Sequence, residues 1–340
     1  MKIKVVFTGG TIGSSQNGGV VSADGMKPKH ILEMYKRKFP FDAEISWETC
    51  FPYEELSENL TCRLLGRLIV YLRDNCIDRD YDGIIVTHGT DPRQYAAAAL
   101  SYCFGDLSIP IVLVSSNYIL EDERSNGFEN FVHAAEFIKC GGRGVFVSYR
   151  NSGECAKIHC GTRVISHKAY SDEVESLNGI EYGYFDDERF KVNNKFSMEY
   201  GNTDICKIFR DSFETAGDGQ DEFSDVLWIR PYVGMRYPRI PKDVKAVLHD
   251  SYHSGTICSK AVDLAGFAAE AQRKNVQIFV CGCGGSAFYE SKKIYEELGF
   301  NVLPIASPIA MYIKLWLCVK SGLDLNCIMK GQLCGDIINY

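Results

Sequence analysis

The chain has 340 residues, of which 46% are hydrophobic and 24% are charged, and its formal net charge is −7. This length allows a large hydrophobic core and two domains. The negative charge argues against a broad surface for nucleic acid or anionic membranes, because such a surface needs a basic patch.

The start of the chain and its cysteines indicate a cytoplasmic protein. The apolar run at residues 3–7 is too short for a signal peptide, and no stretch approaches the roughly 18 consecutive apolar residues of a membrane helix. The 14 cysteines are scattered, so we expect reduced thiols that pack as small hydrophobic groups. The close pair Cys281 and Cys283 lies in a glycine-rich stretch and favours a turn over a metal site.

Strands and helices alternate along the first half of the chain. Apolar runs predict the strands, and amphipathic stretches between them predict the helices. The alternation is typical of a parallel sheet with helices on both faces. The predicted strands are 3–7, 84–86, 111–114 and 144–148, and the predicted helices are 30–37, 61–74, 95–104 and 130–140.

The alternation resumes after a mixed region. Residues 156–210 combine short β-like pieces with glycine turns, which predicts an irregular or antiparallel extension, and the polar stretch 216–225 reads as a linker. We therefore expect domains at 1–205 and 226–340 and a linker at 206–225. Within the second domain, the predicted strands are 226–229, 246–249 and 276–280, and the predicted helices are 259–272, 289–298 and 308–321.

Two threonine-containing turns follow predicted strands. Residues 8–13 (Thr-Gly-Gly-Thr-Ile-Gly) follow the first strand, and residues 87–91 (Thr-His-Gly-Thr-Asp) follow the second. Open α/β sheets bind ligands at the carboxyl ends of their strands, so both turns fall where a site is expected. Two threonine hydroxyls there suggest an amide-cleaving site, which needs a base such as a lysine with a pKa lowered by burial. The Asp91 carboxylate suits an ammonium group.

A nucleotide site is a remote alternative for the first turn. Glycine-rich turns after strands also bind phosphate, but residues 8–13 lack both the third spaced glycine of the dinucleotide fingerprint and the Gly-Lys-Ser/Thr of a P-loop.

The two turns resemble the signature motifs of bacterial-type L-asparaginases, the asparaginase/glutaminase family that uses threonine nucleophiles. The likeness includes residues 81–83 (Tyr-Asp-Gly) and 123–127 (Glu-Arg-Ser-Asn-Gly) and extends over the whole length. It implies an α/β fold with a larger N-terminal parallel-sheet domain and a smaller flavodoxin-like C-terminal domain. It also implies no metal or other cofactor and a homodimer or homotetramer with sites at subunit boundaries.

The resemblance also implies roles for individual residues. Thr11 would be the nucleophile and Thr90 the second catalytic threonine, polarised by Lys168 and Asp91. Asp91 would in addition bind the substrate ammonium. The other substrate-binding residues would be Ser57 for the α-carboxylate, Glu58 for the ammonium, Ser116 on the loop that holds the amide, and the turn glycines Gly10 and Gly89.

The chain departs from the family pattern at several positions. The family carries a tyrosine on a mobile loop after the first motif, where it helps to activate the nucleophile, and residues 14–25 contain none. Pro92 and Arg93 stand where the family prefers Thr-Met, so Arg93 adds a charge near the pocket. Glu290 is a candidate acid for a neighbouring subunit's site.

The leading hypothesis is hydrolysis of the side-chain amide of L-asparagine to L-aspartate and ammonia through a threonine nucleophile. The partner would be a small amino-acid amide, with neither nucleic acid nor membrane involved. Two alternatives remain open because the loop tyrosine is missing. One is an enzyme for another amide, such as glutamine, D-asparagine, or a modified or peptide-linked asparagine. The other is a catalytically weak sensor that binds an amino acid.

Overall fold

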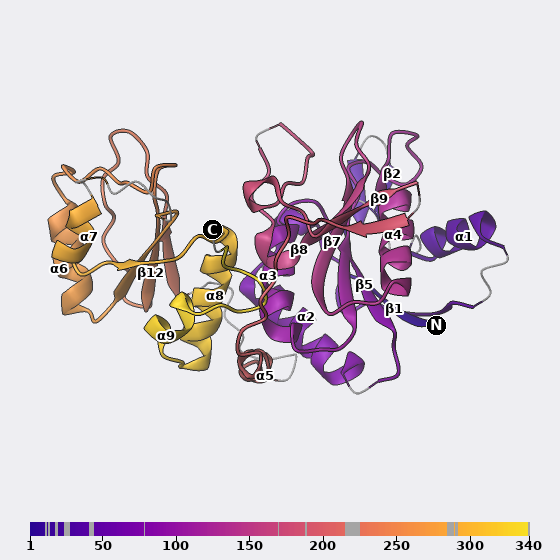
Figure 1. The fold of residues 1–340 in the computed structure, drawn as a ribbon, viewed down its shortest axis with the longest axis horizontal. Helices are drawn as coiled ribbons and strands as arrows, with labels where there is room; N and C mark the ends of the chain where they lie inside the picture. The colour runs from indigo at the N-terminus through magenta and orange to yellow at the C-terminus, as the bar shows by residue number, and fades with distance from the viewer. Residues whose placement is uncertain are drawn as a thin grey trace.

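The fold is built on two β-sheets joined by a layer of helices (Figure 1). The computed structural model describes residues 1–10, 12, 14–17, 20–23, 28–40, 44–77, 79–168, 170–187, 189–214, 225–283, 289 and 292–338, with the backbone alone at 14–17, 20–23, 28 and 29. Among these residues no helix is long and apolar enough to cross a membrane.

The larger sheet has eight strands in the order β10-β9-β8-β7-β6-β5-β1-β4. The strands from β4 to β7 run parallel, and β8, β9 and β10 extend the sheet antiparallel, as the mixed sequence pattern predicted. Their bounds are β1 (Lys2–Phe7), β4 (Ser46–Cys50), β5 (Gly83–Thr87), β6 (Pro110–Val114), β7 (Gly144–Arg150), β8 (Ala156–Cys160), β9 (Gly183–Asp186) and β10 (Arg189–Val192).

Helices cover both faces of the larger sheet, and all four predicted helices of this half are present. Alternate residues of β1 show why two cores form: Ile3 and Val5 pack on one side, and Val6 packs on the other. The first side carries α1 (Pro28–Lys38) and α4 (Gly127–Lys139), and the second carries α2 (Cys62–Cys76) and α3 (Arg93–Phe104).

The smaller sheet is wholly parallel in the order β11-β12-β13-β14. Its strands are β11 (Val226–Ile229), β12 (Ala246–Asp250), β13 (Gln277–Cys281) and β14 (Asn301–Val302), and α6 (Leu264–Arg273) and α7 (Lys293–Glu297) lie on its outer face (Figure 1). These two helices start later than predicted. In the case of α6, the residues before Leu264 belong to the connection that follows β12.

Helix α3 is buried on every side because it lies between the two sheets. Its long alanine and aromatic stretch packs on β7 on one side and on α8 (Pro308–Ser321) on the other, so no polar face is needed. Helix α8 also packs on β12, and one continuous apolar cluster joins both sheets through these two helices. The remaining elements of the described chain are α5 (Asp204–Asp211), α9 (Leu325–Lys330), the β2–β3 hairpin (Ser14–Asn17, Val20–Ala23) and short 3₁₀ turns at Ser57–Asn59, Gly161–Arg163 and Leu177–Gly179.

The linker predicted at 206–225 begins inside a helix. Residue 206 lies within α5 (Asp204–Asp211), whose Cys206 and Phe209 are fully buried against α3 and α8. A short amphipathic helix next to a glycine-rich acidic stretch looks polar in sequence, although one of its faces belongs to the core. Residues 215–224 of the predicted linker lie outside the described residues.

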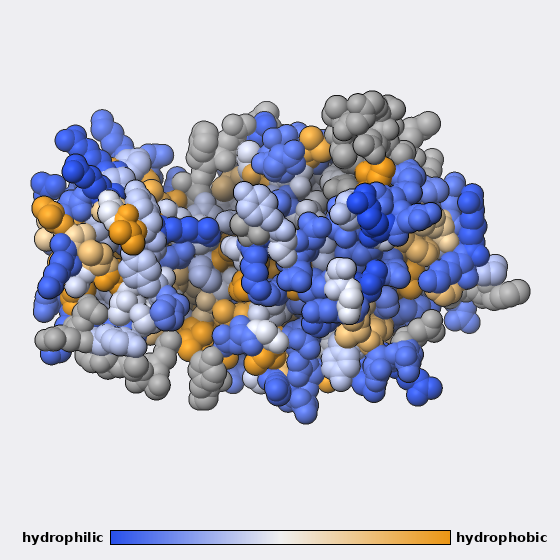
Figure 2. Space-filling model, turned by 90° about the horizontal axis from the view of Figure 1, so that it is seen from above, coloured by the Kyte–Doolittle hydropathy of each residue, from blue (hydrophilic) through white to orange (hydrophobic). Residues whose placement is uncertain are grey.

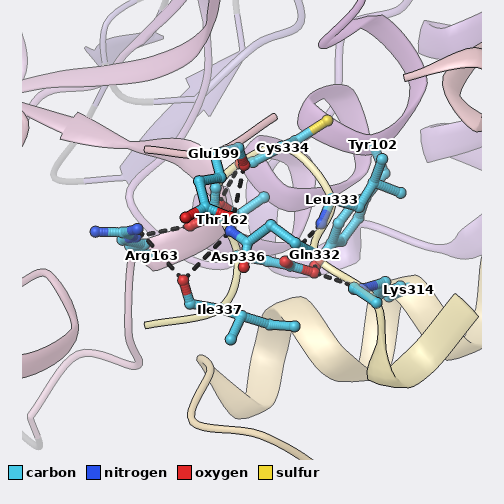
Figure 3. A network of polar contacts seen from close by, with 12 residues as sticks. Tyr102, Thr162, Arg163, Glu199, Lys314, Gln332, Leu333, Cys334, Asp336 and Ile337 are labelled. Carbon is cyan, nitrogen blue, oxygen red and sulfur yellow. Dashed lines mark hydrogen bonds and ion pairs between the residues drawn. The ribbon is translucent and has the colours of Figure 1, made fainter. Parts of the chain in front are cut away.

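The C-terminal segment returns from the smaller lobe to the larger one (Figures 1 and 3). Asp336 is fully buried, where it accepts from Lys314 Nζ at 2.7 Å and from the Tyr102 hydroxyl at 3.0 Å. Arg163 Nε donates to the Gly335 carbonyl at 2.7 Å, and Thr162 Oγ1 donates to the carbonyl of Cys334 at 2.9 Å. Residues 334–336 therefore link α8 to the larger lobe.

The outer surface is mostly hydrophilic on the face that Figure 2 shows, with small apolar patches between charged side chains. This distribution is usual for a globular chain, in which scattered exposed apolar residues carry no special meaning.

Candidate active site

The two threonine motifs meet at the point where the strand order of the larger sheet reverses. After β1 the chain forms β4 on one side of β1, and it then crosses to form β5 on the other side. The turn after β1 leads towards α1 on one face, whereas the turn after β5 leads to α3 on the opposite face. A crevice opens where neighbouring connections diverge in this way, and it is the usual ligand site of an open α/β sheet.

A side-chain hydrogen bond and two glycines hold the motifs together. Thr8 Oγ1 donates to the Thr87 carbonyl at 2.7 Å, which joins the ends of the two strands. Gly10 has a φ of +78°, and a Cβ built on it would lie 2.3 Å from the Gly89 nitrogen. Any larger residue at position 10 would therefore push the turns apart, which explains the glycine in physical terms.

Ser57 lies directly against the second motif. A Cβ on Gly89 would lie only 2.0 Å from the Ser57 Oγ, so the hydroxyl occupies the space that the glycine leaves open. The connection is positioned by Glu55, whose amide donates to the Thr8 carbonyl at 3.3 Å. Glu58, the next residue of the same short turn, is exposed. The structure thus brings Ser57, Gly10 and Gly89 together, with Glu58 next to Ser57 along the chain.

Thr90 and Asp91 stand at the mouth of the crevice. Thr90 is half-buried and Asp91 is exposed, immediately before α3 begins at Arg93. The Thr90 carbonyl lies 3.3 Å from His167 Nε2, so the segment after β8 folds back over the second motif. His167 was not singled out in the sequence, because this contact joins residues 77 positions apart.

Lys168 does not have the environment that the sequence predicted. We expected a buried lysine with a lowered pKa, but Lys168 is exposed and its Nζ pairs with Glu175 Oε1 at 2.5 Å. The Glu175 carboxylate raises the pKa of Lys168, because it stabilises the charged ammonium. Lys168 follows His167, which contacts Thr90, so its backbone lies near the second motif. Its side chain, however, is paired with Glu175.

Ser116 is buried with its hydroxyl turned into its own loop. Its Oγ donates to the Tyr118 carbonyl and lies 2.8 Å from Ser125 Oγ. Asn126 fixes the same loop, since its Oδ1 accepts from the Asn117 amide at 3.0 Å and its Nδ2 donates to the Arg150 carbonyl at 2.9 Å. The Ser116 hydroxyl is therefore engaged within its own loop by Tyr118 and Ser125.

Two titratable residues beneath the crevice are strongly affected by burial. His88 is buried, its Nδ1 lies 3.0 Å from the Gly89 carbonyl, and burial lowers its pKa to about 4, aided by the nearby positive charge of Arg93. It is therefore a neutral packed group at neutral pH. Arg93 was expected to add charge near the pocket, and its side chain, at the start of α3, is fully buried.

One tyrosine is brought to the crevice by the fold. Tyr53 lines a small closed hollow together with Thr8, Ser57, His88 and Gly89. Its hydroxyl is buried beside the Thr8 side chain, and burial raises the pKa of Tyr53.

Two predicted site residues lie outside the described residues: Thr11 and Glu290. The whole stretch 14–25, in which the sequence has no tyrosine, is described by its backbone alone or not at all. Within the described ranges, no cluster of three or more His, Cys, Asp or Glu side chains has the arrangement of a metal site.

Comparison with known proteins gives one consistent family. Residues 2–198 match the family model described as Asparaginase, N-terminal. The chain is 28% identical over 197 residues to the L-asparaginase of Thermococcus kodakarensis, covering 57% of each protein. It is 26% identical over 186 residues to a subunit of the glutamyl-tRNA(Gln) amidotransferase of the same organism, covering 53% of this chain and 38% of that protein. The matched region thus spans little more than half of the L-asparaginase and less than half of the amidotransferase subunit.

Solved structures of similar fold cover the whole chain. The thermostable L-asparaginase from Thermococcus kodakarensis superposes with a TM-score of 0.74 over 100% of both chains, at 24% sequence identity. L-asparaginase I from Vibrio cholerae gives a TM-score of 0.77 over 99% of both chains, at 19% identity. At these identities the likeness establishes the two-lobed α/β fold.

Proposed function

The chain belongs to the asparaginase family, and we propose that it is an amidohydrolase that cleaves the side-chain amide of L-asparagine, giving L-aspartate and ammonia. The observation that carries this proposal is the meeting of Gly10, Gly89 and Ser57 at the reversal point of the larger sheet, with Thr90 and Asp91 at its mouth. A threonine hydroxyl, backbone N–H groups and carboxylates in one crevice are the groups that hydrolysis of an amino-acid amide needs.

The proposed substrate contacts follow from charge. Asp91 and Glu58 are exposed carboxylates on the two segments that meet at Gly89, and they would neutralise the α-ammonium. Ser57 would donate its hydroxyl hydrogen to the α-carboxylate. Two acids and one hydroxyl select a substrate with an amino group of its own, which favours a free amino acid over a plain amide.

The proposed reaction has two steps. Thr11 Oγ attacks the amide carbon, and the carbonyl electrons move to oxygen, where backbone N–H groups of the glycine turns stabilise the oxyanion. The tetrahedral species then expels the nitrogen, which leaves as ammonia after taking the proton that the Thr11 hydroxyl gave up in the attack, and an aspartyl ester of Thr11 remains. Water, polarised beside Thr90, attacks this ester and releases aspartate with the Thr11 hydroxyl restored.

The environment of Lys168 favours one alternative function. A threonine needs a proton acceptor, and Lys168 can serve Thr90 only after it has left Glu175 and lost a proton that Glu175 stabilises. This cost would slow turnover without preventing binding. A sensor that binds an amino acid and hydrolyses it slowly is therefore the second candidate, and it accounts for the same crevice.

We also propose a free amide substrate in place of a tRNA-linked one. Some relatives are named as a subunit of glutamyl-tRNA(Gln) amidotransferase, but the chain covers only 38% of the Thermococcus kodakarensis protein. The net charge of −7 offers little attraction to a polyanion. We further propose that the protein is a cytoplasmic homodimer or homotetramer, which size-exclusion chromatography with light scattering would test.

Ammonia release from purified protein tests the proposal. L-Asparagine, L-glutamine and D-asparagine would be compared for the wild type, Thr11→Ala and Thr90→Val, and thermal shift would report aspartate binding for each protein. The proposal predicts release that is fastest with L-asparagine and abolished by both substitutions. If no ammonia is released while aspartate still raises the melting temperature, the amidohydrolase hypothesis is wrong and the sensor hypothesis is supported.

A further inference from the structure

Arg93 places a buried positive charge directly behind the candidate active site. It is the first residue of α3, and its side chain is 0% exposed. Its Nη1 donates to Ser115 Oγ at the end of β6, and its Cζ lies 4.9 Å from the centre of the Tyr149 ring. The remaining groups, Nε and Nη2, have no hydrogen-bond partner among the residues that the structure describes.

Two buried polar side chains near Arg93, those of Tyr149 and His159, also have hydrogen-bond donors available. Tyr149 on β7 and His159 on β8 are 1% and 2% exposed, and His159 Nε2 has no partner within the described part of the chain. The Tyr149 hydroxyl lies beside the Asn126 side-chain amide, and when it accepts a hydrogen bond from that amide its own hydrogen is still available. His159 pairs with Val147 across the antiparallel strands, so alternation puts Tyr149 and His159 on the same face, the one that α3 covers. When Ser176 Oγ donates to His159 Nδ1, 2.9 Å away, Nε2 carries the imidazole hydrogen and is a donor too.

A buried charge with no carboxylate in contact is strongly unfavourable. The acid that acts on Arg93 is Asp91, but its carboxylate is exposed and acts on the guanidinium only through its charge. Burial lowers the pKa of Arg93 to about 10, so the guanidinium is still charged at neutral pH. Arg93 Nε, Arg93 Nη2 and His159 Nε2 have no acceptor among the described residues, and a bound anion would supply one beside the positive charge.

We propose that a small monovalent anion, of the size of chloride or formate, binds between the Arg93 guanidinium, the Tyr149 hydroxyl and His159 Nε2. The start of α3 adds the positive end of a helix dipole of 12 residues to the same place. The lining side chains are almost completely buried, which restricts the ligand to a small ion. This site is separate from the proposed substrate contacts at Ser57, Glu58 and Asp91, and it does not depend on the proposed function.

Crystals grown in sodium bromide test the site directly. An anomalous peak within hydrogen-bond distance of Arg93 Nε or Nη2 is the expected result. The wild-type melting temperature would also be compared in chloride, bromide, formate and gluconate at one ionic strength. Because unfolding releases a bound ion, the melting temperature reports binding even if the buried ion exchanges slowly in the native state. Gluconate is too large for the site and gives the baseline.

Variants separate the site from general salt effects. We expect chloride, bromide or formate to raise the melting temperature of the wild type and of Arg189→Met, an exposed arginine on β10, but not that of Arg93→Met. A response to formate without one to halides would identify a carboxylate as the occupant. The proposal is overturned by water alone beside Arg93 in the bromide crystals, by no difference between the small anions and gluconate, or by an unchanged response in Arg93→Met. If Arg93→Met does not fold, the bromide crystals and the wild-type melting temperatures still show whether an anion binds at this site.

Discussion

Replacing Gly89 by alanine should force Ser57 away from the second motif. A Cβ at residue 89 would lie 2.0 Å from the Ser57 Oγ and 2.4 Å from the Ser57 Cβ, so both atoms would have to move. Added carbon atoms at packed positions cost about 1–3 kcal/mol, and we expect Gly89→Ala to lower the free energy of unfolding by about 2 kcal/mol. The same change should raise the KM for asparagine, because a displaced Ser57 no longer meets the α-carboxylate.

The compensating change Ser57→Gly tests whether the loss of stability in Gly89→Ala comes from the contact with Ser57. It removes both atoms that the new methyl group would meet, so the double variant should regain most of the lost stability but none of the substrate affinity. Urea denaturation of the four proteins gives the coupling free energy between the two sites, which we expect to be about 1–2 kcal/mol. Gly266→Ala in α6 is the control, because a Cβ there meets nothing within 4 Å. Two results would refute the close contact between Gly89 and Ser57. One is a Gly89→Ala protein as stable as the wild type, and the other is a double variant whose loss of stability equals the sum of the two single losses.

Three further predictions concern charges in the fold and in the site. Asp336→Asn leaves the fully buried Lys314 without its carboxylate and should lower the free energy of unfolding, measured by urea denaturation, by about 3–5 kcal/mol. Replacing both partners, as Lys314→Met with Asp336→Leu, should lower it by less. Equal losses of stability in the two proteins would contradict the buried ion pair. Glu175→Gln frees Lys168 and should raise kcat for ammonia release with little change in KM, so an unchanged kcat would remove Lys168 from the reaction. His88 has a pKa of about 4 when folded and 6.5 when unfolded, so the unfolded chain binds the proton first as the pH falls. Stability should therefore decline from pH 6.5 towards pH 4, by roughly 3 kcal/mol from this group, and His88→Gln should flatten the decline measured by urea midpoints.

The strands and helices of the larger lobe could be predicted because burial imposes a clear pattern on them. In β5 and β6 every residue is buried, and these continuous apolar runs followed by polar turns are easily recognised. The two threonine motifs could be placed at one site for the same reason, since parallel strands end at the same edge of the sheet. The family resemblance was confirmed by the match over residues 2–198.

Features that depend on contacts between distant segments could not be predicted. Lys168 is exposed because Glu175, seven residues later, holds its ammonium outside the crevice, and no periodicity signals such a pair. Helix α5 was assigned to a linker because only a few of its residues are apolar, and these are buried by α3 and α8. The burial of Arg93 was hidden as well, since an arginine at a helix start is usually exposed.

The most direct test of the account is ammonia release from L-asparagine by the wild-type protein and by Thr11→Ala, measured over hours at protein concentrations high enough to detect slow turnover. We expect steady release by the wild type and none by a Thr11→Ala protein that melts at the same temperature. Equal release by the two proteins would contradict a threonine nucleophile at residue 11, and no release by either would contradict amide hydrolysis of asparagine altogether.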